Sequence, residues 1–214
     1  MACSLSGRCR KGQVCGEYYL PLTDCRIRDC GMSYPFDAEK ATQVAGAFTK
    51  LEGGTINVMK LVKLVYLLDR LSIDKYGIPI VGGPYYLLPH GPVVSCLLDL
   101  INKGDALGIR SSWSRYLSKR TDYSINLKRE SPSSMLSEIE KQLLQQIYRR
   151  YGKMDQFALR DWCHKHLPES PEIKKGRKRI SEIFVFERLG KQPAEIQYLI
   201  DVQRESTFLQ GLTV

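Results

Sequence analysis

The residues with the most obvious chemical potential lie together in the sequence DWCHKH. Cysteine and histidine bind zinc and act as partners in nucleophilic catalysis. On a helix, Cys163 and His166 share a face, whereas His164 points about 100° away from Cys163. At most two of the three converge as ligands, so a third would have to come from elsewhere. We therefore interpret Cys163 as a small buried apolar residue, Asp161 as helix surface and Trp162 as a core anchor.

Five of the seven cysteines precede Met32: Cys3, Cys9, Cys15, Cys25 and Cys30. Only the last two, with four residues between them, approach the spacing of a zinc-binding pair. Residues 1–31 lack the apolar centre of a secretory signal and show no apolar periodicity. Two interpretations stay open, a flexible leader upstream of a true start at Met32 and a zinc module, and the spacing favours the leader.

The sequence contains no G-x-S-x-G, no Walker A loop and no G-x-G-x-x-G. We therefore expect no catalytic residue, no cofactor and no metal site, and the protein is not predicted to be an enzyme.

The stretch YYLLPHGPVV places His90 between two prolines and beside a glycine. Its surroundings predict two short strands, Ile78–Val81 and Tyr85–Leu88, joined by a turn at Gly82-Gly83. Pro92 suits the first position of a following helix. His90 then bonds to the backbone of its turn or lies at the rim of a contact surface.

Helical patterns account for most of the remaining chain. Asp37 is a plausible N-cap of a first helix, and Thr55 or Asn57 caps a second. The second helix is apolar around most of its circumference and should be buried. We predict a mainly α fold with a small β-hairpin (α+β), a compact helical domain around a central buried helix near residues 56–74.

Three further helices are predicted after residue 133. The first carries Ser134 or Ser137 with Glu140 in a capping box. The second is DQFALRDWCHKHL, and the third spans about residues 194–209.

The net charge is +9, and cations cluster in residues 110–129 and 174–179. Such clusters bind phosphates or an acidic partner where they converge on one surface, and otherwise form a solvated face. The solvated face is the favoured interpretation. No run approaches the roughly 18 uncharged apolar residues of a membrane span, so no membrane partner is expected. Because residues 1–31 lack a secretory signal, a cytoplasmic location is expected.

The central helix and the hairpin together resemble a known family. MKLVKLVYLLDRLSIDKYGIPI followed by YYLLPHGPVV is similar to the Panacea domain, also called the SocA-like antitoxin domain of phage-associated proteins. The matching residues are Lys60, Lys63, Leu64, Tyr66, Tyr76, Gly77, Pro79, Gly91, Pro92 and Val93. The resemblance covers about residues 35–170, and it predicts a family domain over residues 32–210 preceded by the cysteine-rich leader 1–31. The tract YYLLPH departs from the family, which often has a charged or amide residue and an alanine there.

The resemblance implies a compact helical domain of bacteria, phages and mobile elements. Domains of this family bind and neutralise toxins, and one founding member is an adaptor that delivers its toxin to a cytosolic AAA+ protease. We therefore expect an antitoxin-like protein-binding domain whose partner is a cognate toxin, with the protease as a further partner in the adaptor case. The alternative is a basic nucleic-acid-binding regulator of a mobile element, although no segment is typical of a helix–turn–helix.

Two groups of residues fit a partner surface, because cationic and aromatic side chains dominate interface energetics. The first is a narrow polar stripe on the central helix, expected to face solvent or a partner: Lys60, Lys63 and Arg70. The second is the rim around the predicted hairpin: Tyr85, Tyr86 and His90.

Overall fold

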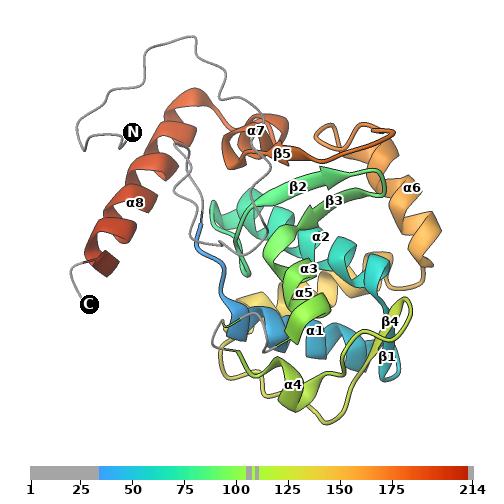
Figure 1. Cartoon of the computed structure of the whole chain (residues 1–214). Coiled ribbons are helices and arrows are strands. Elements are labelled where there is room, and N and C mark those ends of the chain that lie inside the picture. The colour runs from blue at the N-terminus through green and yellow to red at the C-terminus, as the bar shows by residue number, and fades with distance from the viewer. Residues whose placement is uncertain (1–33, 105–107, 109–110, 212–214) are drawn as a thin grey trace, which may run out of the picture.

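The computed structural model describes residues 34–104, 108 and 111–211. These residues form eight helices and five short strands (Figure 1). The helices are α1 (Ala38–Leu51), α2 (Val58–Tyr76), α3 (Ser95–Lys103), α4 (Trp113–Tyr116), α5 (Glu138–Tyr151), α6 (Gln156–His166), α7 (Glu182–Arg188) and α8 (Pro193–Gly211). The strands are β1 (Thr55–Asn57), β2 (Tyr85–Leu88), β3 (Gly91–Val94), β4 (Ser124–Asn126) and β5 (Lys178–Ile180). The mainly helical class with a small β part is confirmed.

Local side-chain chemistry starts the main helices where the sequence predicts. The Asp37 carboxylate accepts the Lys40 N–H at 2.8 Å at the start of α1, and Asn57, rather than Thr55, caps α2. Ser137 and Glu140 form the reciprocal capping box of α5. These caps satisfy backbone N–H groups that would otherwise lack partners.

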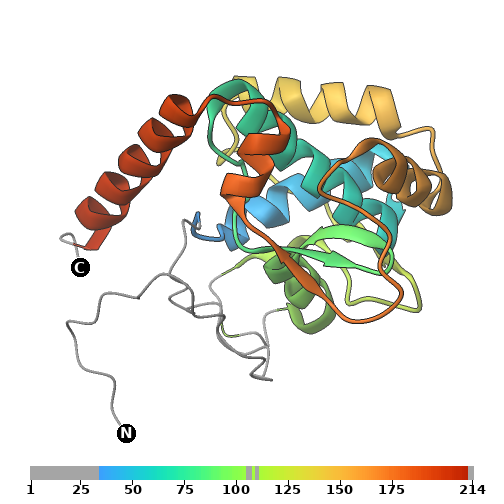
Figure 2. The same cartoon turned by 90° about the horizontal axis from the view of Figure 1, so that it is seen from above.

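Helix α2 is the centre of the fold, as predicted. Figure 2 shows it between α5 on one side and the β2–β3 hairpin on the other, with α1 and α6 also packed against it. Its apolar side chains are buried around the whole circumference: Leu61, Val62, Leu64, Val65, Leu67, Leu68 and Ile73. Such a helix can be buried in the core at little cost only if its few polar side chains also find hydrogen-bond or charge partners.

The strands form two small antiparallel sheets. β1 pairs with β4, and the other sheet has the order β3-β2-β5. In that sheet Tyr86 lies opposite Val93 on β3 and opposite Arg179 on β5. The basic segment 174–179, for which no regular structure was predicted, therefore supplies part of an edge strand.

The predicted hairpin exists but is built from different residues. Tyr85–Leu88 is a strand, whereas its partner is Gly91–Val94 and the turn between them is Pro89-His90. The expectation that Pro92 begins a helix is wrong, because Pro92 lies in β3 and α3 starts at Ser95. A proline is tolerated there because β3 is an edge strand and needs fewer backbone donors.

The segment Ile78–Val81 is not a strand, because a buried carboxylate takes its backbone donors. Asp69 on α2 is fully buried and accepts the N–H groups of Ile80, Val81 and Gly82 at 2.8–3.1 Å. The Tyr85 hydroxyl donates to its second oxygen at 3.1 Å. Burial raises the pKa of the Asp69 carboxyl to about 6 although these four donors oppose the shift, so the group is ionised at neutral pH.

Helix α8 extends away from the helical body in both cartoon views (Figures 1 and 2). Its inner side chains reach back to the chain that follows α2, where Leu199 packs against Gly77. Gly77 ends α2 in the left-handed conformation with φ 75°. Among the described residues, no helix combines the length and the apolar character needed to cross a membrane.

The hydrogen bond to Asp69 predicts unequal effects for two adjacent tyrosines. Tyr85→Phe removes a donor from a buried carboxylate and should lower the free energy of unfolding by about 2 kcal/mol. Tyr86→Phe, on the half-buried opposite face of β2, should change it by less than about 0.5 kcal/mol. Urea unfolding monitored by circular dichroism measures both, and equal effects would contradict the role given to Asp69.

Candidate protein-binding surfaces

Lys60 joins three helix ends rather than facing a partner. Its side chain is buried, its Nζ is paired with the Glu52 carboxylate, and it donates to the carbonyl of Gly152 at 2.8 Å. Glu52 follows α1 and Gly152 follows α5, so one ammonium group ties the ends of both helices to α2.

Lys63 reaches from α2 to the turn-side end of β3. It is 1% exposed, and its Nζ donates to the carbonyl of Pro92 at 3.1 Å. Gly91 has φ 91°, and a Cβ there would lie 3.2 Å from the Lys63 Cε and 3.3 Å from its Nζ. Burial lowers the pKa of Lys63 to about 8, which leaves the ammonium largely charged at neutral pH. The Gly-Pro-Val tract thus accommodates this lysine, because Gly91 leaves room for its side chain and the Pro92 carbonyl accepts its hydrogen bond.

Arg70 holds the segment after α6 against α2. Its Nε donates to the Glu169 carboxylate, which lies 1% exposed beneath it, and the Tyr66 hydroxyl donates to the same oxygen at 3.1 Å. Burial and the neighbouring carboxylate raise the pKa of Tyr66 well above its ordinary value, so its hydroxyl keeps its proton. The pair therefore fixes where the chain turns from α6 towards the basic segment.

The predicted polar stripe is therefore not a surface. Lys60, Lys63 and Arg70 do follow one side of α2, but α5, β3 and the segment after α6 cover that side. The expectation that it faces solvent or a partner is wrong for both lysines, which are buried, while Arg70 stays partly exposed. Tyr85 is likewise buried, and its hydroxyl donates to the Asp69 carboxylate inside the fold.

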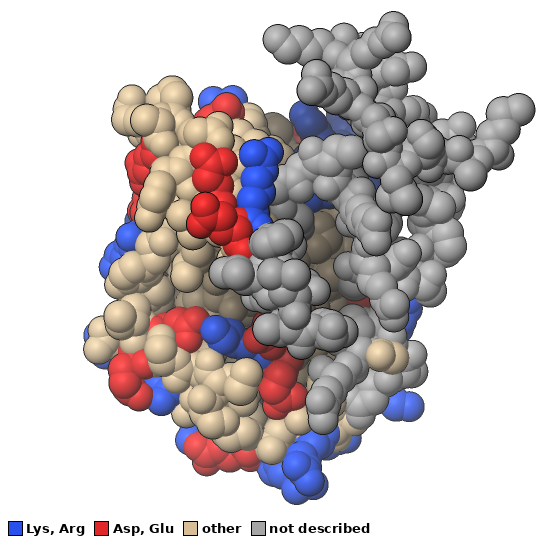
Figure 3. All heavy atoms as spheres, turned by 90° about the vertical axis from the view of Figure 1, so that its left-hand side faces the viewer, with Lys and Arg blue, Asp and Glu red and all other residues tan. Residues whose placement is uncertain are grey.

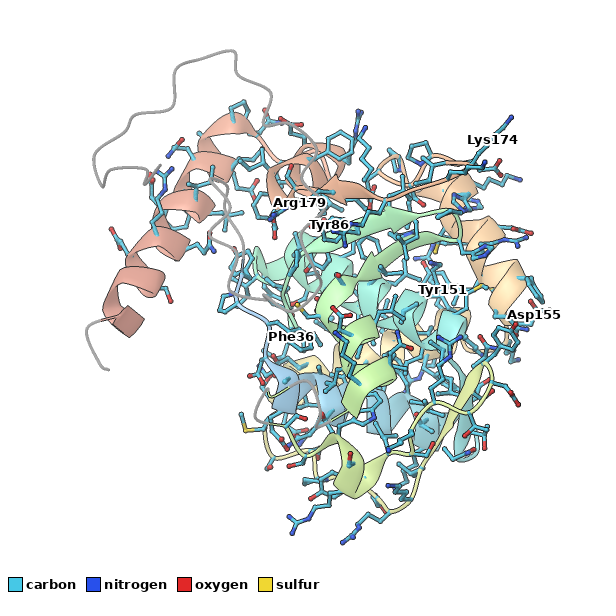
Figure 4. All side chains as sticks on the ribbon, in the orientation of Figure 1. Phe36, Tyr86, Tyr151, Asp155, Lys174 and Arg179 are labelled. Atoms are coloured by element: carbon cyan, nitrogen blue, oxygen red, sulfur yellow. The ribbon has the colours of Figure 1, made fainter. Side chains whose placement is uncertain are left out.

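Tyr86 and His90 do reach the surface, and Tyr86 lies beside the basic segment. The Arg177 guanidinium lies 4.9 Å from the centre of the Tyr86 ring, and Tyr86 and Arg179 lie side by side across β2 and β5 (Figure 4). His90 is exposed at the tip of the β2–β3 hairpin. A binding role for these two residues stays a prediction.

The basic segment is an exposed surface that is partly neutralised by its own neighbours. Lys174, Lys175 and Lys178 are exposed, and Lys174 lies near α6 in Figure 4. Arg179, by contrast, lies 4.0 Å from the buried Glu182 carboxylate. Arg177 is exposed as well, so Lys174, Lys175, Arg177 and Lys178 form the cationic part of this face.

The DWCHKH segment has structural rather than catalytic contacts. Cys163 is fully buried, and burial raises the pKa of its thiol to about 11, the opposite of an activated nucleophile. His166 stacks on Trp162 with ring centres 4.7 Å apart, and the His164 Nδ1 lies 3.0 Å from the carbonyl of Ser170. The part of the chain that the structure describes holds no metal-binding group of three His, Cys, Asp or Glu side chains. The pair Cys25 and Cys30 lies outside the described residues.

A surface that the sequence did not indicate lies between α8 and the chain after α2. A cavity of about 310 Å³ opens there. It is lined by Tyr34, Pro35, Asp37, Ile78, Pro79, Ile80, Val81, Gly82, Leu199, Val202, Gln203 and Ser206. Two of the lining side chains are exposed and apolar, Ile78 and Val202. Figure 3 faces the side on which α8 lies and shows carboxylates, with some Lys and Arg side chains beside them, among uncharged atoms.

One sequence signal could have found this surface. The last helix carries apolar residues on two sides: Ile196, Leu199 and Ile200 on one, and Tyr198 and Val202 on another. A helix that packs on one body needs only one apolar side.

The comparisons with known proteins identify a family but no individual relative. The family model described as "Antitoxin SocA-like, Panacea domain" matches residues 61–168. Searches of the curated proteins and of the solved structures found no match. The matched region runs from α2 to the end of α6 and contains Lys63, Asp69, Arg70 and the Gly91-Pro92 tract.

The Arg70–Glu169 pair predicts a large stability effect at a position just outside that region. Glu169→Ala should lower the free energy of unfolding by about 3 kcal/mol, since it strands the buried Tyr66 hydroxyl and leaves Arg70 unpaired. Glu172→Ala removes an exposed carboxylate three residues later and should cost less than about 0.5 kcal/mol. Chemical denaturation measures the free energy of unfolding of both variants. A mild effect of Glu169→Ala would show that the Arg70–Glu169 pair does not anchor the segment after α6.

Proposed function

Since the chain belongs to the antitoxin SocA-like, Panacea domain family, we propose that it is an antitoxin that binds and neutralises a toxin encoded beside it. The observation that carries this proposal is the family match over residues 61–168. The protein works by direct binding in the cytoplasm and has no chemistry of its own.

The internal contacts support a binding role over a catalytic one. Two of the most deeply buried ionisable side chains of the matched region have structural partners: Lys63 donates to Pro92, and Asp69 accepts from the chain after α2. A catalytic acid, base or nucleophile has to reach a substrate. Side chains that are buried and hydrogen-bonded in this way stabilise the fold. The exposed surfaces are then the places where a partner can bind.

Neutralisation takes one of two routes. The antitoxin either covers the working surface of the toxin or delivers the toxin to a cytosolic AAA+ protease. The routes differ in what becomes of the toxin, because occlusion leaves its amount unchanged whereas delivery lowers it.

Co-expression tests the proposed function. The protein encoded by the neighbouring open reading frame should stop growth when expressed alone, and growth should return when this chain is expressed with it. Immunoblotting of the toxin in strains with and without the protease separates the two routes. A neighbour that is harmless alone, or lethal in the presence of this chain, would reject the antitoxin function.

The basic segment favours a second candidate, a nucleic-acid-binding regulator. Lys174, Lys175 and Lys178 are exposed on one stretch of chain whose Arg177 lies over Tyr86, and clustered cations suit a phosphate backbone. Of the neighbouring arginines, Arg179 faces the Glu182 carboxylate, whereas Arg177 keeps its charge beside the Tyr86 ring.

Salt-dependent binding of the purified protein to its own promoter tests this candidate. Three engaged lysines should give a slope of log affinity against log salt of about −3, and replacing all three with Glu should abolish binding. Absence of binding at about 50 mM salt would remove the candidate.

A further inference from the structure

The outer side of α8 carries an ordered set of exposed residues. Tyr198, Asp201, Val202 and Glu205 follow the spacing i, i+3, i+4 and i+7, which places them on one side of the helix. Tyr198 is 67% exposed and Val202 41%, and both carboxylates are exposed. Two apolar side chains thus stand in water beside two negative charges.

The inner side of the same helix already accounts for its packing. Ile196 is buried, Leu199 lies against Gly77, and Gln203 is buried. Lys191, just before α8, donates to the carbonyl of Asp74 and pairs with Glu195 in the first turn of the helix. The fold therefore holds α8 without using its outer side.

The outer side is continuous with the cavity of about 310 Å³. Val202 belongs to both, and across the cavity stands Ile78, which is 51% exposed although its neighbour Ile80 is buried. A cavity of this size accepts a few large side chains from another molecule. Removing Tyr198, Val202 and Ile78 from water would then contribute to binding in proportion to the apolar area covered.

The charges beside these residues select the chemistry of the partner. Asp201 and Glu205 are negative on a chain whose net charge is +9. Arg204 offsets them in part, with its guanidinium 3.6 Å from the Asp201 carboxylate. Carboxylates at the edge of an apolar surface favour partners with Lys or Arg at the matching positions and disfavour acidic ones.

We propose that the outer side of α8 and the adjoining cavity bind the toxin through a segment whose apolar side chains are flanked by Lys or Arg. This inference rests on the antitoxin function proposed above and specifies its surface. The wall formed by α8 lies outside the matched residues 61–168, so this surface combines the shared domain with an element that the family match does not cover.

Two pairs of variants, matched in residue type and exposure, test the surface. Ile78→Glu and Tyr198→Glu, called the groove variants, place a charge where the toxin should bury apolar area. The controls are Ile139→Glu on α5 and Tyr123→Glu beside β4, since Ile139 is 50% exposed and Tyr123 71%. The dissociation constant of each for the purified toxin is measured by calorimetry, after circular dichroism has shown that the variant is folded.

Each groove variant should weaken toxin binding at least about 30-fold, and each control less than about threefold. Tyr198 is the more exposed of the two groove residues, so Tyr198→Glu should fold even if Ile78→Glu does not. Folded groove variants that bind like the wild type would overturn the inference.

A charge reversal tests the partner chemistry. Glu205→Lys should weaken binding about tenfold at low salt, and the loss should shrink in about 0.5 M salt, where charges on the rim are screened. Glu187→Lys on α7, another exposed carboxylate, is the control and should have little effect. Tighter binding by Glu205→Lys would show that the partner is acidic and would overturn the inference.

The outcomes separate this inference from the function on which it rests. If the wild type neither binds nor neutralises the neighbouring toxin, the antitoxin function fails. If the wild type binds it and the folded groove variants bind equally well, the function stands and only the α8 surface is wrong.

Discussion

The fold depends on one constraint, that a helix buried on all sides must find partners for its polar side chains. Helix α2 carries Lys60, Lys63 and Asp69 into the interior, where an unpaired charge costs several kcal/mol, and its partly exposed Arg70 covers the buried Glu169. Each of them binds a different neighbouring element. These bonds fix four parts of the chain relative to one another: the ends of α1 and α5 beside Lys60, strand β3, the chain after α2 and the segment after α6.

The same constraint explains residues that would otherwise look like unrelated motif positions. Gly91 lacks a side chain where the Lys63 ammonium approaches, and it has a backbone conformation that glycine adopts at little cost. Gly82 is likewise closed to a side chain, since a Cβ there would lie 2.5 Å from the carbonyl of Pro35. Its N–H donates to Asp69. The Lys63 and Gly-Pro-Val elements of the family resemblance are thus two sides of one contact.

Patterns of local origin could be predicted from the sequence. The caps Asp37, Asn57 and Ser137 act within three residues of themselves, and the apolar character of α2 follows from its own composition. The strand partner of β2 could not be predicted, because Asp69 decides it from 11 residues away by taking the N–H of Ile80. The burial of Lys63 could not be predicted for a related reason. In the sequence, a lysine on a helix looks the same whether its ammonium group reaches water or the Pro92 carbonyl. The α8 surface depends on Ile78 and Val202, which only the tertiary fold brings together.

The molecule has an inner frame of paired charges, and the surface proposed to bind the toxin lies outside that frame. Lys63 tests that division most directly, because it is one of the residues that carry the family resemblance, a cation and 1% exposed. Lys63→Met should lower the free energy of unfolding by about 2 kcal/mol, since the Pro92 carbonyl loses its donor, while the folded protein should keep its dissociation constant for the toxin within about twofold. A Lys63→Met protein of unchanged stability that no longer binds the toxin would contradict the account.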